Sequence, residues 1–140
     1  MKTFAVFALA LALLPGCATV PLAPEMPDRL VTSAPAPERA SIIVVRPGWL
    51  GTAVLLPVTL DGLSVGSLAP KTYFHLEVPP GPHVLAVTDG SHVERVHVPA
   101  VAGQQYFYRV TVMPGALVPE GAASGQRAVA RSRLAQRLDQ

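Results

Sequence analysis

The stretch Ser41-Ile-Ile-Val-Val-Arg46 decides the fold class, because it places four β-branched aliphatic residues in a row. A strand with apolar residues on both of its faces is typical of a sheet that is covered on two sides. Pro47-Gly48 follows directly and ends the strand, since proline has no amide donor for a sheet ladder. The sequence therefore predicts a fully covered strand over residues 41–46.

Shorter alternating segments follow this strand, and turn signals separate them. In residues 56–60, Leu56, Val58 and Leu60 alternate with other residues, and Asp61-Gly62 comes next. Asp-Gly is a strong hairpin signal, because both central residues of a type I′ turn need a positive φ. The return strand over residues 63–68 contains Gly66, which predicts a β-bulge.

The same pattern continues to residue 113 and shows no helical period. Further turns are predicted at residues 79–82 and 89–90, and Gly103 precedes the last strand. The residues expected to share a face with others of their strand are Phe74, Leu76 and Val78; His83, Leu85 and Val87; Val96 and Val98; and Tyr106, Tyr108, Val110 and Val112. About seven short strands with turns every ~8–12 residues predict an all-β fold, a small antiparallel β-sandwich over residues 41–113.

Six motifs in this region carry a resemblance. They are Ser41-Ile-Ile-Val-Val-Arg-Pro47, Thr59-Leu-Asp-Gly62, Val65-Gly66, Tyr73-Phe74, Val78-Pro-Pro-Gly-Pro-His83 and Gly103-Gln-Gln-Tyr-Phe-Tyr-Arg-Val110. In this order, over about Ser41 to Leu117, they resemble domain-of-unknown-function family 2846, whose members are bacterial proteins, many of them lipoproteins. The Pro-Gly-x-His segment is also similar to PEGA domains, which are small β-sandwich repeats of envelope proteins. The resemblance implies a fold and an envelope setting, and no established activity.

The first sixteen residues have the features of a secretory signal. Met1-Lys2 supplies a positive charge, and residues 3–14 are almost wholly apolar. Twelve helical residues rise about 18 Å, which is well short of the ~30 Å hydrocarbon core of a bilayer. A charged start, a short apolar core and small residues at the end predict a removable signal peptide.

Leu14-Pro15-Gly16-Cys17 resembles the bacterial lipobox, in which an aliphatic residue and a small residue precede a cysteine. The resemblance implies cleavage between Gly16 and Cys17, and acylation of the Cys17 sulfur and of the new amino group. Two or more acyl chains hold a protein durably on a membrane. Ala18 stands where an aspartate would favour the inner membrane, so the outer membrane, periplasmic face, is expected. The alternative is a plain secretory signal with a chance cysteine.

Two segments flank the predicted sandwich. Residues 17–40 carry the predicted lipidated Cys17 and five prolines, so we expect an extended, unpacked linker that holds the domain away from the membrane; a proline-rich ligand is the alternative. Residues 114–140 are predicted to form a loop to Ser124 and a helix over residues 125–139, with Ala130, Leu134 and Leu138 in one stripe. This helix either packs loosely or touches anionic lipid or a partner.

The charges are balanced over the predicted sandwich. Four basic residues face four acidic ones between Ser41 and Met113, and the basic surplus lies in the last fourteen residues. This distribution gives no broad positive surface for a phosphate backbone, so no nucleic-acid partner is expected.

No catalytic constellation is evident. His75, His83, His92 and His97 lack a cysteine or paired carboxylates that would complete a metal site. Ser91, His92 and Asp89 are more simply a hairpin tip than a nucleophilic triad. We therefore expect no metal, no cofactor and no enzymatic activity.

Trp49 is the best candidate for an exposed contact, because it lies in a loop between Gly48 and Gly51. Arg46, at a strand end, is expected to pack or cap rather than bind. The paired aromatics of the last strand are expected to pack in the core.

The functional expectation is an outer-membrane-anchored periplasmic lipoprotein whose sandwich is a non-catalytic interaction or structural module, with envelope proteins or peptidoglycan as partners. One alternative is a carbohydrate- or peptidoglycan-binding module, which needs aromatics exposed on one face. The other is an envelope enzyme, which needs a cleft with titrating groups. The sequence does not predict an oligomeric state.

Overall fold

The computed structural model describes residues 17–24 and 34–139. The predicted signal peptide, with Gly16 at its end, lies outside the described residues, as do residues 25–33 of the predicted linker. None of the helices in the described ranges is long and apolar enough to cross a bilayer.

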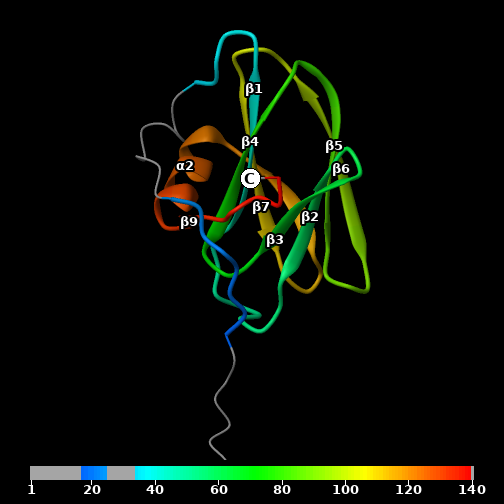
Figure 1. The fold of residues 1–140 in the computed structure, drawn as a ribbon, viewed down its shortest axis with the longest axis vertical. Helices are drawn as coiled ribbons and strands as arrows, with labels where there is room; N and C mark the ends of the chain where they lie inside the picture. Colours follow the sequence, from blue (N-terminus) through cyan, green and yellow to red (C-terminus); the bar gives the residue numbers. More distant parts are fainter. Residues whose placement is uncertain (1–16, 25–33, 140) are drawn as a thin grey trace, which may run out of the picture.

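Two β-sheets packed face to face make up the body of the described chain (Figure 1). One sheet has five strands in the order β8-β7-β1-β4-β9, and the other has four in the order β3-β2-β5-β6. This arrangement confirms the predicted all-β sandwich. The strands are β1 (Ala40–Arg46), β2 (Leu56–Leu60), β3 (Leu63–Leu68), β4 (Thr72–Val78), β5 (Gly81–Thr88), β6 (Val93–Ala100), β7 (Gln105–Thr111), β8 (Ala116–Glu120) and β9 (Arg133–Leu134).

The five-stranded sheet is mixed, so the prediction of a purely antiparallel sandwich is wrong in two places. β1 pairs with β7 in parallel, and β4 pairs with β9 in parallel. β7 lies on one side of β1 and runs in the same direction, whereas β4 lies on the other side and runs in the opposite direction. Helix α2 (Ala122–Ala130) then returns the chain between β8 and β9, as crossover helices do between strands that run the same way.

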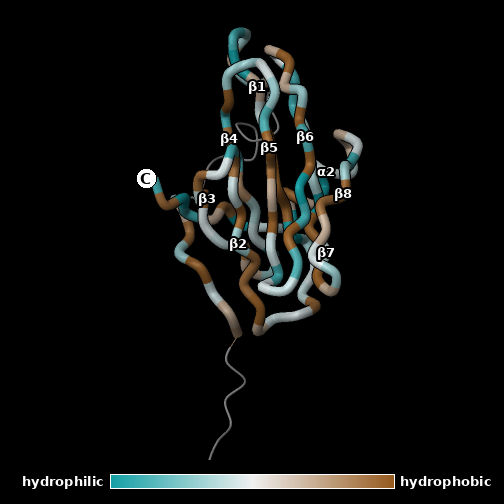
Figure 2. The backbone as a smooth tube through the Cα atoms, turned by 90° about the vertical axis from the view of Figure 1, so that its right-hand side faces the viewer, coloured by the Kyte–Doolittle hydropathy of each residue, from teal (hydrophilic) through white to brown (hydrophobic). Residues whose placement is uncertain are grey.

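Strand β1 lies at the centre of the larger sheet, and all seven of its residues are buried. Ile42 and Val44 face the four-stranded sheet and join the main core. Ile43 and Val45 face the other way and pack with Val129 of α2, which covers the outer face of β1 and β7 (Figure 1). Because both faces of β1 are covered, its residues from Ile42 to Val45 are all apolar instead of alternating with polar ones. Figure 2 shows brown, hydrophobic segments along the strands, interrupted by teal, hydrophilic ones.

The predicted turn chemistry is confirmed in the first hairpin. Asp61 and Gly62 have φ values of 53° and 80°, as a type I′ turn requires. The register of β2 and β3 shifts between Val58 and Thr59, so a bulge lies next to Gly66. A Cβ on Gly66 would lie 2.9 Å from the Phe74 ring, so glycine is needed where the β-bulge crosses the core.

The predicted short C-terminal helix is present, but the bounds predicted for the loop and for the helix in residues 114–139 are wrong. The segment predicted as a loop contains β8, whose Leu117 is buried in the core, and the helix spans only Ala122–Ala130. Its end is fixed where Ser132 Oγ donates to the Ala128 carbonyl, at 2.8 Å. Leu134 then lies in β9, so the predicted stripe does not lie on one helix. The sandwich therefore continues well beyond residue 113.

Candidate functional site

The residue predicted to carry lipid lies directly against the folded body. Cys17 is exposed, and the amide of the next residue, Ala18, donates to the Thr52 carbonyl at 2.8 Å. Thr52 belongs to the loop between β1 and β2, residues 47–55. The sulfur of Cys17 is thus accessible and about one residue away from a fixed part of the domain.

Residues 17–24, which we call the strap, are packed rather than free. Ala23 donates its amide to the Leu134 carbonyl (3.0 Å), and Gln136 donates to the Pro21 carbonyl (2.9 Å). Leu22 forms an antiparallel bridge with Ala135, so the strap lies alongside the C-terminal segment after β9 (Figure 1). Val20 packs against the main core.

The predicted linker was expected to be unpacked, and for its first residues, 17–24, this expectation is wrong. The strap covers the edge of the larger sheet beyond β9, and an uncovered edge would leave backbone donors and acceptors without partners. Pro21 and Pro24 are compatible with that place, because proline is tolerated at sheet edges.

Arg46 holds the loop that receives the strap. Its Nη1 donates to the carbonyls of Val54 (2.6 Å) and Leu68 (3.0 Å), and its Nη2 donates to those of Leu50 (3.1 Å) and Gly51 (2.8 Å). The residue is 1% exposed, and burial lowers the pKa of its guanidinium. The Nε has no partner among the described residues. Arg46 therefore packs, as predicted. Its guanidinium supplies hydrogen bonds to backbone carbonyls at the point where β1 ends and no neighbouring strand supplies them.

Three large apolar side chains are exposed at this end of the molecule. Trp49 is 71% exposed, Leu50 63% and Met113 75%. Strands β1 and β7 both end here, and their following loops touch: a Cβ on Gly51 would lie 3.1 Å from Val112 Cγ1. We call the group formed by Cys17, the 47–55 loop and the 112–115 loop the Cys17 end. Trp49 is exposed as expected, and its contact role stays a prediction.

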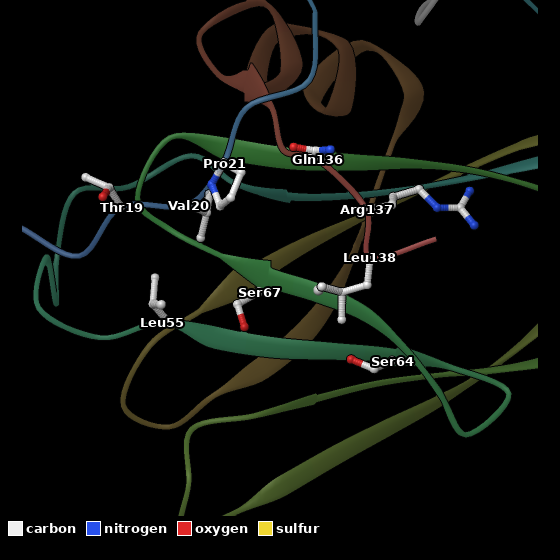
Figure 3. A pocket seen from close by; sticks show the side chains of 10 residues that line it. Thr19, Val20, Pro21, Leu55, Ser64, Ser67, Gln136, Arg137 and Leu138 are labelled. Carbon is white, nitrogen blue, oxygen red and sulfur yellow. The ribbon is translucent and has the colours of Figure 1, made fainter. Parts of the chain in front are cut away.

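Two shallow hollows flank the strap. One, of about 450 Å³, lies between the strap, β3 and the C-terminal segment, with Val20, Leu55 and Leu138 on its wall beside the hydroxyls of Ser64 and Ser67 (Figure 3). Its one charged lining residue is Arg137, which is paired with Asp139.

The other hollow, of about 340 Å³, also borders the strap. It is lined by Ala18 and Leu22 together with Lys71, Arg131 and Arg133. No carboxylate lines it, so its charged side chains are all basic.

His83, which is buried, and Asp61, which is partly exposed, form an ion pair that the sequence did not indicate. Asp61 Oδ2 accepts from His83 Nδ1 at 2.6 Å, and the other ring nitrogen, Nε2, donates to the Pro79 carbonyl at 2.8 Å. Burial alone would lower the pKa of His83, but the bonds to Asp61 and Pro79 outweigh it and raise that pKa. The bond from His83 lowers the pKa of Asp61. Both ring nitrogens are occupied, so the pair joins the β2–β3 turn to β5.

The other titratable groups are dispersed. Ser91 Oγ donates to Asp89 Oδ1 at 2.9 Å rather than to His92, and the amides of Ser91, His92 and Gly115 donate to the same carboxylate and lower its pKa. His75 contacts Ser41 Oγ at 3.0 Å. Within the described ranges, no group of three or more histidine, cysteine, aspartate or glutamate side chains is placed to hold a metal ion.

The aromatic side chains of the described strands are used in packing. Phe74 and Tyr108 lie in the main core, and Tyr73 and Phe107 pack beneath α2. The Tyr106 hydroxyl donates to the Pro99 carbonyl and accepts from the Val101 amide, both at 3.0 Å. Among the described residues, Trp49 is therefore the aromatic side chain that faces solvent most openly.

Comparison with known proteins gives one distant relative. Over 99 residues the chain is 24% identical to an uncharacterized protein of Haemophilus influenzae, an alignment that covers 69% of this chain. The chain spans 59% of the length of that relative. No family model and no solved structure matches the chain. The likeness to domain-of-unknown-function family 2846 therefore remains a proposal.

Proposed function

We propose that this chain is a lipoprotein of the bacterial envelope, anchored through Cys17 at the periplasmic face of the outer membrane, whose sandwich is a non-catalytic interaction or structural module. The observation that carries the proposal is the position of Cys17. It follows a lipobox-like Leu14-Pro15-Gly16, it is exposed, and it lies where the folded body begins. A buried or core-facing cysteine could not receive acyl chains.

The engagement of two titratable side chains in structural hydrogen bonds supports a non-catalytic role. Both ring nitrogens of His83 are engaged, and the Asp89 carboxylate accepts three amide bonds and a hydroxyl bond within its own turn and the neighbouring loop. General acid–base catalysis needs a titrating group within hydrogen-bond reach of substrate. Envelope proteins and peptidoglycan are the partners that we propose for such a module. A carbohydrate platform is less well supported, because the strand aromatics are packed inside.

Fractionation of cells that express the full chain tests the anchor. The parent protein should appear in the outer-membrane fraction, and a Cys17→Ser variant should appear in the soluble periplasm or remain uncleaved. Ala18→Asp is the matched control, since it keeps the cysteine and should move the protein to the inner membrane. If Cys17→Ser fractionated with the outer membrane as the parent does, the proposal would be wrong.

A further inference from the structure

We propose that the Cys17 end is a membrane-contact surface: the 47–55 loop and Met113 lie in the interfacial region of the bilayer to which Cys17 is attached. This inference rests on the proposed lipid anchor and adds an orientation to it. The domain does not sit at a distance from the membrane on a flexible tether, and its β1–β2 loop faces the phospholipid headgroups.

The first argument is the length of chain between the anchor and the domain. The Ala18 amide, one residue after Cys17, is already bonded to Thr52. Trp49 is three residues from Thr52, a span of at most about 11 Å for extended chain. The headgroup region on each side of the ~30 Å hydrocarbon core is about 5–8 Å thick. Acyl chains on Cys17 therefore bring the Trp49 loop to the membrane surface.

The second argument is the chemistry of the exposed side chains. Trp49, Leu50 and Met113 are all more than half exposed, and all lie at the Cys17 end. Tryptophan is favoured at membrane interfaces, because its ring is apolar and its indole N–H remains within reach of water and headgroups. The loop that carries two of these side chains is fixed by the Arg46 bonds, so their exposure is part of the built fold rather than of a frayed end.

The third argument is charge. The hollow beside the strap presents Lys71, Arg131 and Arg133 and is lined by no carboxylate. Asp89, which accepts the Gly115 amide of the 112–115 loop, stays ionised because the hydrogen bonds from Ser91, His92 and Gly115 lower its pKa, and the three basic side chains outnumber it. Basic side chains close to a bilayer are attracted to anionic lipid. The exposed apolar side chains, the basic side chains beside them and the attachment point at Cys17 together fit a phospholipid surface better than a protein partner.

The test uses Trp49 as a native reporter, since the chain contains one tryptophan. The mature lipidated protein is reconstituted into vesicles of phosphatidylethanolamine and phosphatidylglycerol, with and without brominated acyl chains, and flotation measures attachment. We expect the Trp49 emission to shift to shorter wavelength relative to soluble Cys17→Ser protein, and brominated lipid to quench it by about half. The control is a Trp49→Phe, Leu63→Trp double variant. Leu63 is 75% exposed at the turn of the β2–β3 hairpin, away from the Cys17 end, and its reporter should not be quenched.

Three results would overturn the inference. If the protein floats with the vesicles while Trp49 keeps the emission of the soluble form, the anchor holds but the loop faces water, and the surface is free for a protein partner. If both reporters are quenched equally, lipid contact is not specific to the Cys17 end. If the correctly processed protein does not float at all, the proposed anchor itself is wrong, and the orientation falls with it.

Discussion

Replacing Arg46 with methionine should loosen the loop that presents Trp49 and should destabilise the whole sandwich. Methionine fills a similar apolar volume but donates no hydrogen bond. The substitution therefore removes the four bonds from the guanidinium to backbone carbonyls of the 47–55 loop and of Leu68. It also removes a buried cation that has no carboxylate among its hydrogen-bond partners.

The size of the effect follows from how deeply each carbonyl is buried. The Leu68 carbonyl is bonded in a buried position, and a buried acceptor that loses its donor costs about 1–3 kcal/mol. The three loop carbonyls are partly buried, so water can replace the donor in part, at about 0.5–1 kcal/mol each. The methionine variant no longer has to bury the charge of the guanidinium, and this gain offsets some of the sum. The expected net loss is about 3 kcal/mol of unfolding free energy.

Urea unfolding of the soluble Cys17→Ser chain, followed by far-ultraviolet circular dichroism, measures that loss. Amide hydrogen exchange at Val54, whose N–H donates to the Gly51 carbonyl within the loop, reports the loop directly and should speed up. The stability of Arg46→Lys should lie between that of the parent and that of Arg46→Met, because one ammonium group cannot donate to four carbonyls as the planar guanidinium does. Arg95→Met, on the exposed side of β6, is the control and should change stability by less than about 0.5 kcal/mol. A loss below about 1 kcal/mol for Arg46→Met would refute the reasoning.

Three further predictions concern packing, pH and the strap. Gly125→Ala should lower the thermal midpoint by several degrees although alanine favours helix, because its Cβ would overlap the Phe107 ring; a raised midpoint would contradict this packing. His83→Gln should cost about 1 kcal/mol more at pH 5.5 than at pH 9. The folded pKa of His83 is raised above 6.5, so its bond to Asp61 stabilises fully below that value and is lost as pH rises through the folded pKa; equal costs in urea titrations at both pH values would count against the pair. The Ala23 amide should exchange slowly with deuterium, whereas an unpacked linker would exchange at the rate of a free peptide.

The parts of the fold that local sequence determines could be predicted. The β-branched run of β1 shows its two-sided burial in its composition, and Asp61-Gly62 specifies its own turn through the φ values that it allows. The exposure of Trp49 follows from its place among loop glycines.

Features that depend on residues far apart in sequence could not be predicted. From Pro21 onward the strap is held by bonds to residues more than one hundred positions later, and nothing in its proline-rich composition indicates that pairing. In the sequence, Arg46 is an ordinary charged residue at a strand end. Its hydrogen bonds to the loop carbonyls depend on how the 47–55 loop folds around it. In the tail, Leu134 and Leu138 are spaced as in a helix, but Leu134 instead pairs with Tyr73 at the sheet edge.

The molecular mass and first residue of the mature protein, purified from its native membrane, test the proposed anchor most directly. We predict a chain that begins at Cys17, with a mass that exceeds that of the polypeptide by acyl groups on the sulfur and on the terminal nitrogen. A free thiol on Cys17, or a mature chain that begins at any other residue, would contradict the lipid anchor and the membrane orientation derived from it.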